Sequence, residues 1–237
     1  GGAALMLKEG VFRDFAPDAV FAMHVISTLN VGTVALRPGP ALSGADGFKL
    51  VVHGRQTHGA MPWNGVDPIV TAAQIVEQAQ TIVSRRLDIG TLPAVLSFGI
   101  VEGGTRHNIV PGKVELQGTL RSFDPAMRQQ AIDHLRGIAE HVAAANGATA
   151  ELQIPMGDSY PVTVNDAALT ARVRSSLVKA VGHAHVVEAP PAMPSEDFAY
   201  FAKEVPGVYF FVGATPAGQD AAKAAANHSP RFFMDEG

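Results

Sequence analysis

The sequence predicts an α/β domain into which a compact α+β domain is inserted. Residues 44–158 show strand and helix patterns in the order β-α-β-β-α-β, whereas residues 1–43 and 159–237 carry short apolar runs and separate helices. Of the 237 residues, 47% are apolar, which is enough for two hydrophobic cores. We therefore expect a flanking α/β domain and a ferredoxin-like insert, in which four antiparallel strands carry both helices on one face.

Composition and charge exclude several classes of protein. The formal net charge is −4 and the pI is about 6.1, so no basic surface is available to bind nucleic acid. No apolar run reaches the roughly 18–20 residues that span a bilayer, and there is no cysteine for a disulfide or a thiolate metal site. The observed start has no signal-peptide pattern. We expect a cytoplasmic protein that binds neither nucleic acid nor membrane.

The first flank predicts a helix and two short strands. Leu5, Leu7 and neighbouring alanines favour a helix that ends at Gly10, and apolar runs over 19–25 and 32–36 favour strands. The sequence begins inside this helix without methionine and stops directly after an apolar stretch. We expect it to be a piece of a longer protein; a short complete protein with frayed ends is the alternative.

In the insert, segments with the apolar spacing of a strand alternate with segments with the apolar spacing of a helix. Phe48, Leu50 and Val52 recur at every second position, which is typical of a half-buried strand. Asp67 and Asp124 each precede a proline and an apolar pattern of helical spacing, so both are expected to cap helices. The remaining predicted strands cover residues 94–101, 114–120 and 149–155.

The second flank predicts two helices and a buried strand. Asp166 begins a helix that ends at Gly182, and the segment Ser195-Glu196-Asp197 caps a shorter one. The wholly apolar run 208–212 is typical of a buried strand, and a loop then leads to His228.

Two histidines of the flanking domain are candidates for metal ligands. His24 lies inside an apolar strand pattern, and His228 lies in the loop after the buried strand, a place where α/β sheets often carry function. Taken singly, each is more simply explained as a hydrogen-bonded core histidine or a loop histidine. A zinc site needs three or four ligands, and no HExxH or CxxC pattern supplies the others. The residues alone therefore indicate an incomplete metal site.

His58, Asn108 and Arg121 are the polar candidates in the insert. His58 lies in a glycine-rich loop after the first strand, where a solvated histidine is the simpler interpretation. Asn108 lies in a turn and Arg121 ends a strand on its polar face; an amide and a guanidinium can together hold a carboxylate, although a solvated surface arginine is the ordinary alternative. No GxSxG elbow, cysteine nucleophile or phosphate loop offers a competing chemistry.

Seven short strings occur in a fixed order along almost the whole chain. They are 18–25 (DAVFAMHV), 58–62 (HGAMP), 65–69 (GVDPI), 108–111 (NIVP), 118–124 (GTLRSFD), 195–198 (SEDF) and 228–232 (HSPRF). Any one string is a weak signal, whereas seven in register are specific. Together they resemble the amidohydrolase branch of the zinc peptidases, a family that includes hippurate hydrolase, N-acyl-amino-acid amidohydrolase and plant auxin-conjugate hydrolases.

The resemblance implies a domain plan and an activity. Residues 1–43 and 159–237 would form part of a catalytic domain, and residues 44–158 an inserted lid through which two copies form a homodimer. The intact enzyme would use two divalent ions (zinc, manganese or nickel) to hydrolyse the amide bond of N-acyl amino acids or small peptide-like substrates.

The resemblance also implies roles for the five candidate residues. His24 and His228 would be metal ligands. His58 would reach toward the scissile carbonyl as a catalytic residue. Asn108 and Arg121 would hold the carboxylate of the substrate.

The sequence departs from the family pattern in one respect. The first half of the family's catalytic domain carries a Cys or Asp and His ligand pair and then two adjacent glutamates, one of them the general base, and the present sequence begins just past that point. We therefore expect this part alone to be inactive and to bind metal poorly or not at all. An alternative hypothesis is a binding or dimerisation module without catalysis, since the insert exposes a sheet edge.

Overall fold

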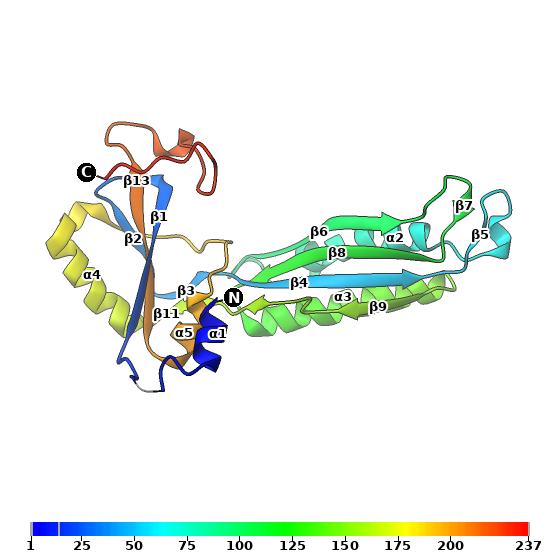
Figure 1. Cartoon of the computed structure of the whole chain (residues 1–237), viewed down its shortest axis with the longest axis horizontal. Coiled ribbons are helices and arrows are strands. Elements are labelled where there is room, and N and C mark those ends of the chain that lie inside the picture. The colour runs from blue at the N-terminus through cyan, green and yellow to red at the C-terminus, as the bar shows by residue number, and fades with distance from the viewer. Residues whose placement is uncertain (1, 14, 237) are drawn as a thin grey trace. The chain divides into compact units, whose positions relative to one another are not determined.

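The computed structural model describes residues 2–13 and 15–236, which form two compact units. The outer unit comprises Gly1–Ser43 and Pro161–Gly237, and the inner unit comprises Gly44–Tyr160. Figure 1 shows the elements of each unit. The second boundary lies slightly beyond the expected residue 158, because Ser159 and Tyr160 form a short strand that pairs with the first strand of the inner unit.

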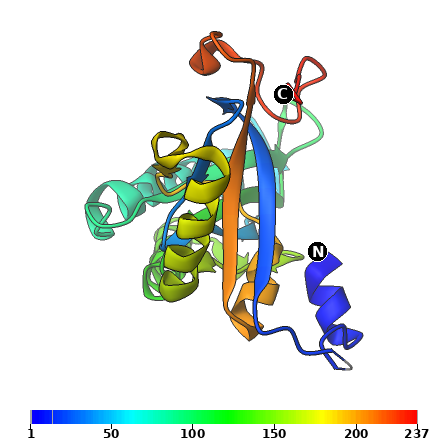
Figure 2. The same ribbon diagram turned by 90° about the vertical axis from the view of Figure 1, so that its left-hand side faces the viewer.

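A mixed four-stranded sheet forms the centre of the outer unit, in the order β1-β13-β2-β12. β1 runs parallel to β13, β13 antiparallel to β2, and β2 parallel to β12, so β1 is an edge strand. Figure 2 shows β1 and β13 side by side. The predicted strands are confirmed, and β1 continues beyond its predicted end. The bounds are Val20–Asn30 for β1, Val34–Leu36 for β2, Val186–Glu188 for β12 and Gly207–Thr215 for β13.

Helices pack on this sheet through two small hydrophobic cores. Leu169 of α4 joins Leu36 and Val208 in one core, and Phe198 of α5 joins Tyr209 in the other. In the described parts of the chain, no helix combines the length and apolar character needed to cross a bilayer. The α-helices of this unit are α1 (Gly2–Lys8), α4 (Ala167–Val181) and α5 (Phe198–Glu204), and its 3-10 turns are η3 (His183–His185) and η4 (Ala221–Lys223). A second, two-stranded sheet is formed by β3 (Gly39–Leu42) and β11 (Thr163–Asn165).

α4 begins and ends as the sequence predicts, whereas α5 does not begin as expected. The Asp166 carboxylate accepts a hydrogen bond from the Leu169 N–H, and Gly182, at φ +88°, follows the last turn. Asp197 precedes α5 but makes no side-chain cap there. Its Oδ2 instead accepts the Ala3 N–H at 2.9 Å, at the start of α1. The predicted capping of α5 by this carboxylate is wrong, because the start of α1 also has an unpaired N–H and lies beside it.

An antiparallel sheet of five strands forms the inner unit. The order is β10-β4-β8-β6, and β9 also pairs with β4. The elements follow one another as β4-α2-β6-β8-α3-β9, the predicted order, and β10 is an additional strand. The bounds are Gly44–His53 (β4), Thr57–His58 (β5), Pro62–Asn64 (η1), Pro68–Thr81 (α2), Ile82–Arg86 (η2), Ala94–Gly103 (β6), Ile109–Val110 (β7), Lys113–Ser122 (β8), Pro125–Ala145 (α3), Thr149–Gln153 (β9) and Ser159–Tyr160 (β10).

One hydrophobic core joins this sheet to α2 and α3, which lie on the same side of it in Figure 1. Phe48, Leu50 and Val52 of β4 are fully buried and pack in the same cluster as Ile75 of α2 and Leu135 of α3. Burial of each such side chain contributes about 1.5–3 kcal/mol. Both helices begin at aspartate caps, as predicted. In Figure 1 no helix of the described residues covers the opposite face of the sheet, where the side chains of Lys49, Glu115 and Gln117 bond to one another.

Candidate metal and substrate site

His24 and His228 meet beside the outer sheet. His24 lies on β1 and is half-buried, whereas His228 is exposed in the segment that follows β13. Their ring centroids are 6.0 Å apart, and the ring planes are inclined by 67°. Two imidazoles that bind one ion through nitrogen can have centroids at most about 6.4 Å apart, since the metal–nitrogen bond is about 2.1 Å. That limit applies to a linear N–metal–N arrangement, so the observed separation places both imidazoles at one site and leaves open whether they bind the same ion or two adjacent ions.

Asn227 determines where His228 lies. Its side-chain amide donates to the Val25 carbonyl at 2.7 Å, and its Oδ1 accepts the Ser27 N–H at 3.0 Å. These bonds fix the loop to β1 one residue before His228, whose φ of 64° lies in the left-handed region that non-glycine residues seldom adopt. The sequence did not indicate a role for Asn227, because its hydrogen-bond partners lie about 200 residues earlier in the chain. The one local signal was that this amide directly precedes His228, a candidate metal ligand.

The ring of His24 is oriented by the adjacent backbone. Its Nδ1 lies 2.6 Å from the Val25 carbonyl oxygen, so this nitrogen donates, and in the neutral ring Nε2 is the nitrogen that has the lone pair. A neutral imidazole held in this way is suited to metal ligation. Within residues 2–13 and 15–236, however, no three histidine, aspartate or glutamate side chains are arranged to hold an ion. The two imidazoles fit part of a metal site and not all of it.

A half-buried carboxylate, that of Glu196, lies near His24. Burial and the neighbouring Asp197 raise the pKa of Glu196 above the ordinary value of 4.5, and the proximity of His24 acts in the opposite direction. Burial, with Glu196 as the second cause, also raises the pKa of Tyr209. The sequence indicated only a carboxylate at a helix start. Its place near His24 could not be inferred, since the two residues lie in distant parts of the chain.

His58 and Asn108 lie together at one tip of the inner unit. His58 ends β5, and Asn108 directly precedes β7, the strand that pairs with β5. The Gly59 N–H donates a hydrogen bond to the Asn108 carbonyl oxygen at 2.8 Å. Both residues are exposed. Nδ1 of His58 accepts the Ala60 N–H at 3.0 Å, so the neutral ring carries its proton on Nε2 and presents a hydrogen-bond donor.

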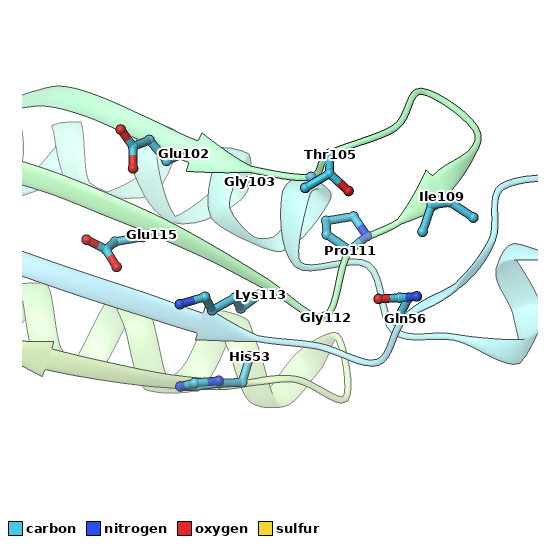
Figure 3. A pocket seen from close by; sticks show the side chains of 11 residues that line it. His53, Gln56, Glu102, Gly103, Thr105, Ile109, Pro111, Gly112, Lys113 and Glu115 are labelled. Carbon is cyan, nitrogen blue, oxygen red and sulfur yellow. The ribbon is translucent and has the colours of Figure 1, made fainter.

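A hollow of about 530 Å³ opens on the helix-free face of the inner sheet, beside β7. Glu115 in its wall pairs with Lys49 at 2.7 Å, and this hydrogen bond is the main cause that lowers the pKa of Glu115. Neither His58 nor Asn108 is among the residues that line the hollow. It is therefore a separate polar hollow next to the tip that carries these two residues. Figure 3 shows its titratable lining residues, which are His53, Glu102, Lys113 and Glu115.

Arg121 lies at the opposite end of the inner sheet. It is in register with Ala45, near the start of β4, whereas β7 precedes the other end of β8, at Lys113. The extended strand from Lys113 to Arg121 is about 27 Å long. The resemblance implied that Asn108 and Arg121 hold one carboxylate, but within one copy of the inner unit the structure does not bring them together.

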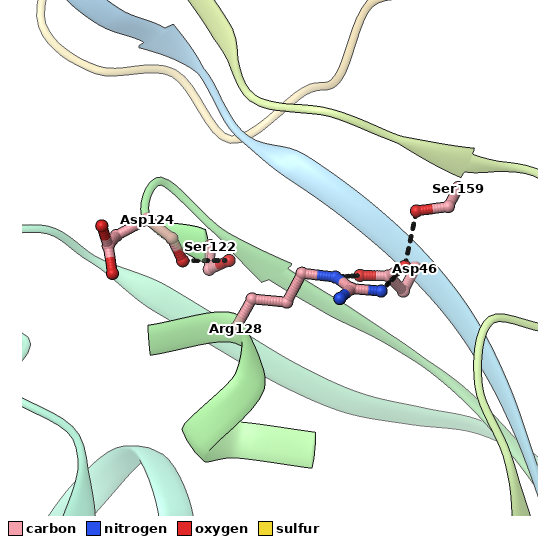
Figure 4. Close-up of polar contacts among 5 residues, drawn as sticks. All are labelled: Asp46, Ser122, Asp124, Arg128 and Ser159. Carbon is pink, nitrogen blue, oxygen red and sulfur yellow. Dashed lines mark hydrogen bonds and ion pairs between the residues drawn. The ribbon is translucent and has the colours of Figure 1, made fainter. Parts of the chain in front are cut away.

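A buried ion pair holds the same end of the sheet as Arg121. Asp46 of β4 is 2% exposed, and Arg128 of α3 donates to both of its carboxylate oxygens, at 2.6 and 2.8 Å (Figure 4). Ser159 of β10 donates a further hydrogen bond to this carboxylate at 2.6 Å. The cluster therefore ties β4, α3 and β10 together where the chain enters and leaves the inner unit.

These features define a class of two-unit proteins. An α/β unit carries the His24–His228 pair, and the α+β unit inserted into its sequence carries His58 and Asn108 at one tip. The chain belongs to peptidase family M20/M25/M40, whose model matches residues 1–236. The resemblance found in the sequence is thereby confirmed at the level of the family.

Relatives of known sequence and structure are longer than this chain. Thermostable carboxypeptidase 2 of Saccharolobus solfataricus is 37% identical over 236 residues, which cover 100% of this chain and 58% of that protein. N-acetyl-L-cysteine deacetylase of Bacillus subtilis is 34% identical over 99% of this chain and 53% of the relative. The solved structure of the Bacillus subtilis YXEP protein, described as a dinuclear metal-binding M20 peptidase, matches with a TM-score of 0.77 at 29% identity, over 98% of this chain and 56% of that one. The chain thus spans a little more than half the length of these relatives.

Proposed function

We propose that this chain is part of a metal-dependent amidohydrolase that cleaves the amide bond of N-acyl amino acids, hippurate-like compounds among them. The observation that carries the proposal is the 6.0 Å separation of the His24 and His228 rings, which come from opposite flanks of the chain. The length of the relatives supports a further part of the protein that supplies the other ligands and the general base. This chain alone is therefore expected to be inactive.

His24 and His228 hold divalent ions in this proposal. His24 uses Nε2, the nitrogen that its bond to the Val25 carbonyl leaves unprotonated, and Asn227 positions His228. When bound, such ions supply Lewis-acid polarisation of the amide carbonyl and of water. Imidazole ligands suit zinc, manganese and nickel, and two ions are proposed in line with the dinuclear description of one relative.

The inner unit supplies the residues that contact the substrate. His58 donates its Nε2–H to the oxygen on which negative charge develops, a role supported by the hydrogen bond that leaves this donor free. Arg121 holds the substrate carboxylate through two parallel hydrogen bonds, and Asn108 adds an amide donor. Loss of one oxyanion donor of this kind commonly lowers kcat by about 10²–10³.

The separation of these residues favours a site shared by two copies. About 27 Å of strand lies between the Arg121 end of the inner sheet and the His58 end, which a small substrate cannot bridge. We propose that Arg121 of one copy and the His58–Asn108 tip of another act on one substrate. This arrangement requires a homodimer.

The edge of the inner sheet offers a surface for that dimer. Edge strand β6 exposes Val101 to 64%, and α2 exposes Ile69 and Val70 to about half. A largely apolar hollow of about 440 Å³ lies between these two elements. We propose that the inner unit is a ferredoxin-like lid, and that a second copy pairs its own β6 with this edge around a two-fold axis.

A binding or dimerisation module without catalysis is the second candidate function. The exposed β6 edge favours it as much as it favours the enzyme. The two functions differ in what they require of the outer unit, since only the hydrolase needs the imidazole pair.

The test uses the full-length protein loaded with zinc, manganese or nickel. Hydrolysis of N-benzoylglycine is measured for the wild type, for His24→Ala and His228→Ala, and for His185→Ala, a control that removes an exposed imidazole elsewhere in the outer unit. We expect the wild type and the control to be active and both site variants to lose nearly all activity. A metal-loaded dimer that cleaves no N-acyl amino acid would favour the binding module instead.

A further inference from the structure

Two large apolar side chains are exposed in the turn that follows His58. Met61 is 45% exposed and Trp63 75% exposed, and Trp63 is the one tryptophan of the sequence. Tryptophan buries a larger apolar area on contact than most other side chains, so its burial contributes a large favourable free energy. Exposed apolar groups beside candidate functional residues commonly mark contact sites. Neither side chain has a part in the roles proposed above.

Hydrogen bonds tie this turn to His58. The Met61 N–H donates to the His58 carbonyl at 2.8 Å, and the Thr57 hydroxyl donates to the Met61 carbonyl at 3.1 Å. Gly65, just after η1, packs so closely on Thr57 that an added Cβ would lie 2.5 Å from the threonine methyl carbon. The turn that carries Met61 and Trp63 is therefore held against the strand that carries His58.

The two neighbours of His58 differ in chemistry. β7 brings the exposed amide of Asn108, which suits the polar amino-acid part of the substrate. The turn brings Met61 and Trp63, which suit an apolar group. Because the oxygen that His58 approaches belongs to the acyl group, the substituent on that carbonyl carbon must lie directly beside this tip.

We propose that Met61 and Trp63 form an acyl-group subsite that makes the enzyme prefer aromatic or other bulky apolar acyl groups to acetyl. This inference rests on the proposed amide hydrolysis and on the role of His58 in it. An aromatic acyl ring packs against the indole, and the flexible thioether of Met61 adapts to its outline. An acetyl group presents much less apolar surface for either side chain to cover.

The test compares kcat/KM of the full-length, metal-loaded protein for N-benzoyl-L-alanine and N-acetyl-L-alanine, which differ only in the acyl group. Trp63→Ala is expected to lower kcat/KM for the benzoyl substrate about tenfold and to change that for the acetyl substrate by less than about twofold. Trp63→Phe keeps an aromatic ring and should retain most of the preference. Ile89→Ala, which truncates a 49% exposed side chain in the loop before β6, is the matched control and should alter neither.

A second readout follows binding directly. The fluorescence of Trp63, taken as the difference between the wild type and Trp63→Phe, should change on addition of N-benzoylglycine and much less on addition of N-acetylglycine. This signal does not depend on turnover.

The outcomes separate the subsite from the function on which it rests. Equal losses on both substrates, or a loss on neither, would overturn the subsite and leave the proposed hydrolysis standing. Dissociation of Trp63→Ala into monomers at the assay concentration would also overturn it, since the indole would then belong to the subunit interface. A wild type that cleaves neither substrate would overturn the proposed function and the subsite together.

Discussion

The Asn227 side chain links the two members of the imidazole pair, since it bonds to β1, which carries His24, and directly precedes His228. We predict that Asn227→Ala lowers the metal affinity of the full-length protein about 10–100-fold, because His228 is no longer held in place. Competition with a chelator of known affinity measures this change. Asn146→Ala, which removes an amide at the end of α3, is the control. Unchanged affinity in Asn227→Ala would show that the loop holds His228 without it.

Glu115 should make stability depend on pH. Its hydrogen bond with Lys49 holds the pKa of the carboxyl below the ordinary 4.5 in the folded state. The bond therefore stabilises the protein above that value, and the contribution is lost as the pH falls through the folded-state pKa. We predict that Glu115→Gln has a lower urea midpoint than the wild type at pH 7, and that the two midpoints converge as the pH falls through the lowered pKa of Glu115. A difference that is constant from pH 7 to pH 3 would contradict this account.

At the level of residues, the sequence identified the histidines and not what positions them. His24 and His228 could be selected because their strings match a family in register. The roles of Asn227 and of Asp197 depend on partners that folding brings from the other end of the chain. No local pattern contains that information, because hydrogen bonds of this kind are set by tertiary contacts.

Among the elements, β4, α3 and β10 depend on the buried Asp46 carboxylate. We predict that Asp46→Ala lowers the free energy of unfolding by about 3 kcal/mol, because Arg128 then loses its partner. This value lies at the lower end of the range of stability losses for broken buried ion pairs, because the Arg128 side chain is 32% exposed. Ser159→Ala should cost about 1 kcal/mol.

Urea unfolding followed by circular dichroism measures these two changes. Asp133→Asn is the control, since Asp133 is an exposed carboxylate on the same helix that accepts a hydrogen bond from the Gln129 side chain, one turn away. An Asp46→Ala protein as stable as this control would show that the ion pair contributes nothing net.

The longer elements were predictable, and several of the shortest were not. Alternation over 48–52 predicts β4, and an aspartate before a proline predicts the start of α2 and of α3, because both signals are local. β3, β10 and β11 contain two to four residues each and exist only through pairing with remote segments. Periodicity over so few residues carries no signal.

For the whole molecule, the β6 edge should determine the oligomeric state. We predict that Val101→Glu converts a homodimer of the full-length protein into monomers, because a charge at this edge opposes pairing with a second copy. Sedimentation equilibrium measures the change. Val164→Glu, at a 45% exposed position on β11 of the outer unit, is the matched control and should remain dimeric. A dimer that persists in Val101→Glu would move the interface elsewhere.

The plan of an insert within an α/β domain followed from the change in pattern at residue 44 and after residue 158. The distance between Asn108 and Arg121 followed as well, because Arg121 ends the strand that comes after the Asn108 turn. The position of His58 beside that turn did not, because the pairing of β5 with β7 is a tertiary contact. The distance between Arg121 and the His58 tip is what makes the proposed site depend on a second copy.

The account depends on His24 and His228 as ligands of the bound ions. The most direct test is a crystal structure of the metal-loaded, full-length protein with anomalous scattering recorded at the absorption edge of the metal. We predict anomalous peaks about 2.0–2.2 Å from His24 Nε2 and from a ring nitrogen of His228. Peaks coordinated by neither imidazole would contradict the account.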